Sequence, residues 1–218
     1  MKTLVKICGM TRVEDAVLCA GSGVDFLGYI FYPPSKRYVS VARAGEIISQ
    51  VRRQYPEVKH VGVFVDEDTD VILKAVREAK LDAVQLHGNE RPDTCERIAE
   101  NGVTVIKALG MSAGGSTQEF RDFEVPFYLC DTYDPKLVGG TGRTFDLALL
   151  PEGLPMEQTF LAGGLTPENV KAAIEQVRPY AVDVSSGVEA SPGVKSPELV
   201  IDFMSSVGAA QTAAAIER

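Results

Sequence analysis

Histidine and cysteine, the residues that most often build metal sites and disulfides, are scarce in this sequence. It has only two histidines, His60 and His87, and no carboxylate spacing around them matches a zinc site. The four cysteines form no CxxC pair and do not lie in a small secreted domain, so we expect reduced thiols at Cys8, Cys19, Cys95 and Cys130. We therefore expect neither a metal site nor a disulfide.

A long apolar run and an excess of positive charge are also missing. No stretch approaches the ~18 apolar residues that a membrane helix needs, and Lys6 interrupts the apolar N-terminal stretch. Lysine and arginine total 22 against 30 aspartates and glutamates, a net charge of −8, which gives no basic surface for nucleic acid or an anionic membrane. The sequence predicts a soluble cytoplasmic protein without nucleic-acid or membrane partners, in which local groups hold any anionic ligand.

What the sequence does contain is a series of short β-branched runs that alternate with helical patterns. With 218 residues, 45% of them hydrophobic, the chain is expected to form one domain over residues 1–218. Eight strands are predicted within residues 3–8, 24–31, 58–65, 82–88, 103–109, 126–131, 158–164 and 181–186, each followed by a helix. Apolar strands separated by helices imply a parallel sheet, and eight such units predict a single-domain (β/α)8 TIM barrel.

A doubly wound open sheet is the alternative fold. No GxGxxG motif follows the first strand, and polar candidates lie at the carboxyl ends of nearly all strands, which favours the mouth of a barrel over one crevice. The longest irregular segment, Thr132 to Thr144, is predicted to be an active-site loop.

Helix starts are marked by three local signals. Thr11 with Glu14 indicates a capping box, and Thr166 and Ser196 each precede a proline, which predicts an N-cap followed by proline at the first helical position.

Glycine-rich turns in the second half predict a phosphate site. In a barrel, the loops after the seventh and eighth strands commonly bind phosphate, because backbone N–H groups without side chains can approach the oxygens closely. The alternative is that these glycines only form tight turns. The candidate phosphate-binding residues are Gly140, Gly142, Gly163, Gly164, Ser185, Ser186 and Gly187.

Two strand ends carry candidates for acid–base chemistry. Cys8 ends the first strand just before a helix start, where its thiolate could act as a base, although an isolated strand cysteine is more often a small buried hydrophobe. Asp131 ends the sixth strand after an apolar run, where desolvation could keep a proton on it for use as a general acid, with a loop-capping role as the alternative.

Three further side chains are candidates for binding a substrate. Arg37 lies in a proline-stiffened loop and could hold a carboxylate, or it could be a solvated surface charge. His87 ends the fourth strand and faces either the mouth or a structural partner. Asp183 lies within the eighth strand and must be paired or face a polar cavity, where sugar hydroxyls are plausible partners.

The motifs KICGMT, FYPPSKRYV, VGVFVD, VQLHGNE, GGTGRTFD, GGLTPENV and VDVSSGVE together resemble the phosphoribosylanthranilate isomerase family of tryptophan biosynthesis. The resemblance runs from Lys6 to Glu189. It implies a (β/α)8 barrel that converts N-(5'-phosphoribosyl)anthranilate to the 1-deoxyribulose 5-phosphate product by an Amadori rearrangement, without metal or organic cofactor. It also implies that Cys8 is the general base, that Asp131 is the general acid and that Arg37 binds the anthranilate carboxylate.

Two positions depart from the family pattern, since Leu147 stands where tryptophan is expected and Ala162 where serine is more usual. Among alternative enzymes, resemblance to the histidine-pathway sugar isomerase would imply an aspartate in place of Cys8. Resemblance to indole-glycerol-phosphate synthase would imply a lysine-centred site, for which Lys6 is the candidate. A non-catalytic sugar-phosphate binding protein is the alternative from another class, and the sequence leaves monomer and homodimer open.

Overall fold

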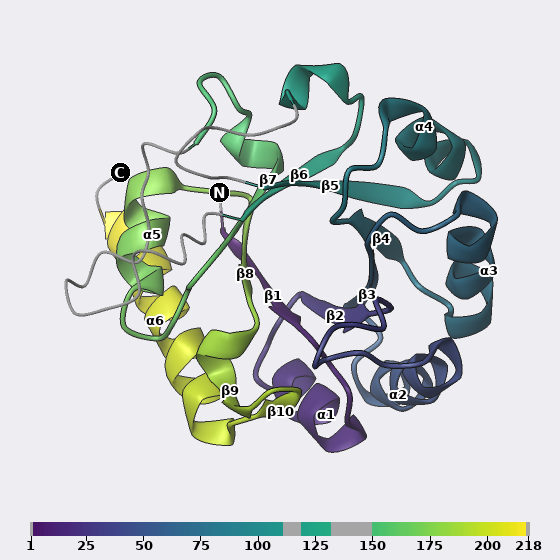
Figure 1. The fold of residues 1–218 in the computed structure, drawn as a ribbon. Coiled ribbons are helices and arrows are strands. Elements are labelled where there is room, and N and C mark those ends of the chain that lie inside the picture. The colour runs from purple at the N-terminus through teal and green to yellow at the C-terminus, as the bar shows by residue number, and fades with distance from the viewer. Residues whose placement is uncertain (1, 111–118, 132–149, 217–218) are drawn as a thin grey trace.

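The structure is a computed structural model that describes residues 2–110, 119–131 and 150–216. Eight parallel strands close into one barrel, in which β8 pairs with β1 (Figure 1). They are β1 (Leu4–Cys8), β2 (Phe26–Ile30), β3 (Lys59–Phe64), β4 (Ala83–Leu86), β5 (Thr104–Gly110), β6 (Phe127–Asp131), β7 (Thr159–Ala162) and β8 (Ala181–Val184). The predicted barrel is confirmed, and the open doubly wound sheet is wrong because a closed barrel has no edge strand.

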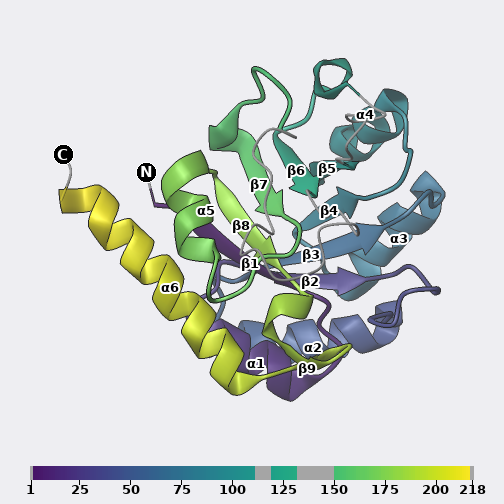
Figure 2. The ribbon, with the colours of Figure 1, turned by 60° about the vertical axis from the view of Figure 1, so that its left-hand side comes forward.

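Six α-helices among the described residues surround the barrel, as Figures 1 and 2 show. They are α1 (Val13–Gly21), α2 (Val41–Gln54), α3 (Thr69–Ala79), α4 (Pro92–Glu100), α5 (Val170–Val177) and α6 (Pro197–Ile216). None of the described helices is both long and apolar enough to cross a membrane.

Short elements complete the described chain. Single 3-10 turns are η1 (Phe120–Asp122), η4 (Met156–Gln158) and η5 (Ser186–Val188), and the hairpin of β9 (Glu189–Ser191) and β10 (Val194–Lys195) follows β8. Between β5 and β6 the described residues form only η1. The predicted active-site loop from Thr132 to Thr144 lies outside the described residues, as does Leu147.

Inside the barrel, the part near the amino ends of the strands is apolar and the part near their carboxyl ends is polar. Alternate residues of each strand point inward, and near the amino ends they form one apolar cluster that includes Phe26, Phe127 and Phe160. The aromatic rings of Phe26 and Phe127 both meet Phe160 edge-on, with centroids 5.3 and 5.8 Å away. Further along the same inward face, the alternation brings Cys8 and Asp131 to the carboxyl ends of their strands, where they line a pocket.

Two of the three predicted helix starts are wrong. The N-cap of α1 is Arg12, without a side-chain cap, and the Thr11 hydroxyl donates to the carbonyl oxygen of Gly193 at 2.6 Å. Helix α5 begins only at Val170, because the side chain of Asn169 closes the preceding turn by accepting from the backbone N–H of Thr166 at 2.8 Å. The Ser196 start is confirmed, since its hydroxyl accepts from the Leu199 N–H at 3.3 Å, directly ahead of the proline that begins α6.

Candidate active site

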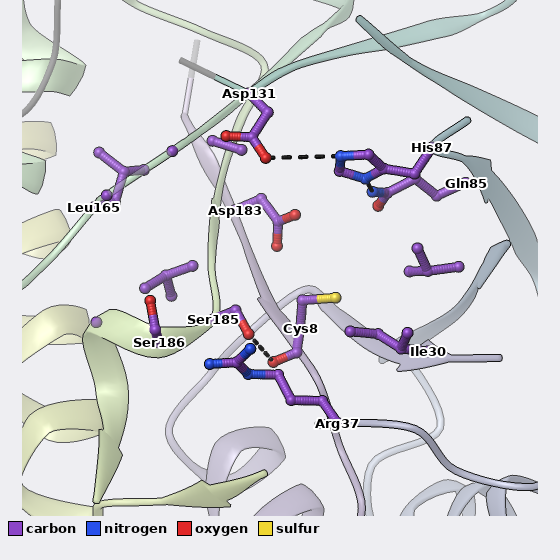
Figure 3. A pocket seen from close by; sticks show the side chains of 16 residues that line it. Cys8, Ile30, Arg37, Gln85, His87, Asp131, Leu165, Asp183, Ser185 and Ser186 are labelled. Carbon is purple, nitrogen blue, oxygen red and sulfur yellow. Dashed lines mark hydrogen bonds and ion pairs between the residues drawn. The ribbon is translucent and has the colours of Figure 1, made fainter. Parts of the chain in front are cut away.

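A pocket of about 340 Å³ opens among the carboxyl ends of the strands (Figure 3). Its volume is within the range of small-molecule sites, roughly 300 to 1,000 Å³. The predicted site residues that line it are Cys8, Arg37, His87, Asp131, Gly163, Gly164, Asp183, Ser185, Ser186 and Gly187. Gly140 and Gly142 lie outside the described residues.

Cys8 holds its thiol on the inward face at the end of β1. Glycine at position 28 of the neighbouring strand makes room for it, because a Cβ there would lie 2.6 Å from Cys8 Sγ. Burial raises the pKa of the Cys8 thiol, and the ammonium groups of Lys6 and Lys195 counteract part of that rise.

Lys6 and Asp183 form a buried ion pair across the β1–β8 ladder, with Nζ 2.7 Å from Oδ2. Burial alone would lower the pKa of Lys6, but Asp183 and the Cys8 thiol raise it above its ordinary value. The Lys6 side chain is fully buried in this pair and is not among the residues that line the pocket, which argues against a lysine-centred reaction. The other oxygen of Asp183, Oδ1, is buried without a partner among the described residues, in a side chain that lines the pocket. The expectation that Asp183 is paired is confirmed by this ion pair, and sugar hydroxyls as further partners stay a prediction.

Asp131 lies at the end of β6 opposite His87, with His87 Nε2 and Asp131 Oδ2 3.6 Å apart (Figure 3). The other ring nitrogen, Nδ1, is 2.7 Å from Nε2 of Gln85, two residues earlier on β4. With Nδ1 accepting from the amide, the proton of a neutral His87 ring is on Nε2 and faces Asp131. Sequence reasoning missed Gln85, although its inward position follows from the two-residue period that ends at His87.

The turn after β7, with Gly163 and Gly164, packs against the turn after β8, with Ser185, Ser186 and Gly187. Together these two turns line one side of the pocket, called the cup below. Gly163 and Gly164 have φ values of 98° and 64°, which favour glycine. A Cβ at Gly187 would lie 1.9 Å from the carbonyl oxygen of Leu165, so the two turns could not approach this closely with any side chain there. The Ser185 hydroxyl donates to the carbonyl oxygen of Cys8 at 3.1 Å, so its proton is already engaged within the protein.

Arg37 reaches the pocket from the loop after β2. Its guanidinium is held by Glu189, with Nε 2.9 Å from Oε1 and Nη2 2.7 Å from Oε2. Gly9, with φ of 86°, allows this approach, because a Cβ there would lie 2.8 Å from Arg37 Cδ. Sequence reasoning missed Glu189 and its second partner Lys195, since neither ends a barrel strand and only the fold brings them to Arg37.

These observations define a (β/α)8 barrel with a ligand pocket at its carboxyl-terminal mouth, where a thiol and a carboxyl group flank the space above a glycine-lined cup. The candidate acid–base side chains and the candidate anion-binding turns therefore line one cavity.

The chain belongs to the family described as N-(5'-phosphoribosyl)anthranilate isomerase, which matches residues 5–206. A relative of that name from Thermotoga maritima is 45% identical over 207 residues, covering 92% of this chain and 96% of the relative. The crystal structure of the phosphoribosyl anthranilate isomerase from Thermotoga maritima has a TM-score of 0.80 at 44% identity, covering 95% of this chain and 99% of that one.

A second solved structure of such an isomerase is a complex with reduced 1-(o-carboxyphenylamino)-1-deoxyribulose 5-phosphate. It has a TM-score of 0.76 at 41% identity and covers 95% of this chain and 99% of that one.

Proposed function

We propose that this protein isomerises N-(5'-phosphoribosyl)anthranilate to 1-(2-carboxyphenylamino)-1-deoxyribulose 5-phosphate, a step of tryptophan biosynthesis. Family membership supports the reaction. The mechanism rests on one observation: the side chains of Cys8 and Asp131 line the same pocket, and Asp183 lies between them in the view of Figure 3.

Asp131 is the general acid and Cys8 the general base of the proposed mechanism. Asp131 gives its proton to the ring oxygen of the furanose, the bond between that oxygen and C1' breaks, and the anilino nitrogen lone pair forms an iminium. The iminium acidifies the C2' hydrogen, which the Cys8 thiolate removes to give an enolamine. This enolamine then tautomerises to the ketone. Because the iminium within the substrate is the electron sink, the mechanism requires no metal or organic cofactor.

The remaining predicted residues would bind the ends of the substrate. Arg37 faces the anthranilate carboxylate with the donors that Glu189 leaves unused. His87 and Asp183 bind sugar hydroxyls, for which Oδ1 of Asp183, without a partner in the described part of the chain, is an acceptor. The phosphate lies in the cup of the β7 and β8 turns, formed by Gly163, Gly164, Ser185, Ser186 and Gly187, with Gly140 and Gly142 predicted to join it.

The test is to mix the purified chain with N-(5'-phosphoribosyl)anthranilate and follow the anthranilate fluorescence. Conversion supports the isomerase, whereas saturable binding without conversion would leave the sugar-phosphate binding protein. Conversion of the histidine-pathway aminoaldose alone would favour that alternative isomerase. The expected cytoplasmic location, the absence of nucleic-acid partners and the oligomeric state remain predictions.

A further inference from the structure

Lys195, in the hairpin after β8, is a buried cation that the proposed mechanism does not use. Its ammonium group is fully inaccessible to solvent. It donates to the carbonyl oxygen of Cys8 at 2.7 Å, to the carbonyl oxygen of Ser185 at 3.1 Å and to Glu189 Oε1 at 2.9 Å. An ammonium has three N–H donors, so all of them are occupied. Lys195 is therefore not free to transfer a proton or to bind a ligand.

Each partner of Lys195 belongs to a different part of the site. Cys8 carries the proposed base, Ser185 belongs to the proposed phosphate cup, and Glu189 holds Arg37, the proposed carboxylate ligand. Although burial raises the pKa of Glu189, its hydrogen bonds from Arg37 and Lys195 hold that pKa below the ordinary value. The carboxylate therefore stays ionised between two cations and fixes one edge of the Arg37 guanidinium.

The β9–β10 hairpin is also held in place by hydrogen bonds that do not involve the Lys195 ammonium. The backbone N–H of Lys195 donates to Asp15 Oδ2 at 3.1 Å, and Thr11 donates to the carbonyl oxygen of Gly193 at 2.6 Å. Since backbone contacts hold the hairpin to α1 and the preceding loop, a buried ion pair is not needed to close this part of the fold. Buried pairs of this kind contribute little net stability compared with apolar side chains.

We propose that Lys195 and Glu189 form a positioning pair that orients two groups of the site: the base, Cys8, and Arg37, which binds the substrate carboxylate. The roles of Cys8 and Arg37 rest on the proposed function. Lys195 holds the end of β1 and places a positive charge near the thiol, while Glu189 orients Arg37 and neutralises part of that charge. Removing either partner should therefore change both the thiol and the carboxylate site, with opposite signs at the thiol.

The experiment uses the ligand-free protein and measures alkylation of Cys8 by iodoacetamide against pH, with the Cys8 peptide followed by mass spectrometry. Lys195→Met removes the cation and the three hydrogen bonds, so the midpoint of alkylation should move up by about one pH unit, the low end of what a neighbouring charge causes. Glu189→Gln leaves the cation without its counter-ion, so the midpoint should move down. An unchanged midpoint in both variants would overturn the proposal.

Lys107→Met is the matched control. Lys107 is an equally buried lysine that donates to the carbonyl oxygens of Leu86 at 3.5 Å and Gly88 at 2.8 Å and to Glu90 at 2.8 Å. Its loss leaves the same kinds of unpaired groups at a distance from β1, so the Cys8 midpoint should stay at the wild-type value. Equal shifts in Lys107→Met and Lys195→Met would show general loosening of the fold and would contradict a specific role. If Lys195→Met does not fold, Glu189→Gln carries the test through its downward shift.

Steady-state kinetics test the second part of the proposal, that Glu189 orients Arg37. Glu189→Gln should raise KM for N-(5'-phosphoribosyl)anthranilate about tenfold, as expected for one misoriented charged hydrogen bond, with a smaller change in kcat. A KM at the wild-type value would refute the link between Glu189 and Arg37. If the two variants show the expected alkylation shifts but the wild-type protein has no isomerase activity, the proposed function fails while the influence of the pair on the thiol stands.

Discussion

His60 is a buried histidine that does not line the pocket. Replacing it should make the free energy of unfolding fall less steeply as the pH is lowered. His60 lies in β3, fully buried, with Nδ1 3.0 Å from the hydroxyl of Tyr29 and with Nε2 unpartnered among the described residues. Burial, with a contribution from the nearby Arg52 cation, lowers the pKa of His60 to about 4. The folded protein therefore holds the ring neutral at pH values where the unfolded chain protonates it.

The size and sign of the effect follow from linkage. An unfolded histidine has a pKa of about 6.5, so the folded value near 4 corresponds to about 3 kcal/mol of unfolding free energy. Above pH ~6.5 both states are neutral and the stabilisation is complete. As the pH falls from about 6.5 to about 4, the unfolded state gains a proton that the folded state lacks, so stability is lost across that window.

Urea unfolding between pH 7.5 and 4 measures this loss in wild type and in His60→Asn. Asparagine keeps an acceptor near the position of Nδ1 for Tyr29 but does not titrate. The free energy of unfolding of His60→Asn should therefore fall by about 3 kcal/mol less than that of wild type over this pH window. The same carboxylates titrate in both proteins, so the difference between the two curves isolates the His60 imidazole. Parallel curves for wild type and His60→Asn would refute the reasoning.

Four predictions concern the site itself. Cys8→Ala and Asp131→Asn should each lower kcat on the order of 10²–10⁴ without loss of the folded circular dichroism spectrum, and wild-type turnover in either would remove that residue from the mechanism. Arg37→Ala should weaken substrate binding by roughly 2–5 kcal/mol, and an analogue without the carboxylate should lose little more in that variant, since additive losses would mean that the two groups do not touch. The profile of kcat/KM against pH should be bell-shaped, with one limb altered by Asp131→Asn and the other by Cys8→Ser; if both variants keep the profile at a lower height, the titrating groups lie elsewhere. Gly28→Ala should lower kcat because its Cβ would meet Cys8 Sγ at 2.6 Å, and unchanged kinetics would show that the thiol can move aside without cost.

The sequence by itself determined the barrel and most of the inward-facing polar residues. Strands and helices are local patterns with periods of two and 3.6 residues, so eight apolar runs separated by helical faces define the order of the elements. The same period places Cys8, Asp131 and Asp183 on the inward face near the strand ends, and it would have placed Gln85 there with His87.

The tertiary structure alone decided which groups meet between distant segments. Arg37 and Glu189 are 152 residues apart and Lys195 is 187 residues from Cys8, so no local pattern relates them. The contact of the Thr11 hydroxyl with the carbonyl oxygen of Gly193, 182 residues away, has the same origin. The Asn169 side chain, by contrast, closes the turn after Thr166 through a local hydrogen bond that sequence reasoning missed. A side chain with several possible hydrogen-bond partners takes the one that the fold brings nearest, and that choice depends on three-dimensional packing rather than on neighbours in the sequence.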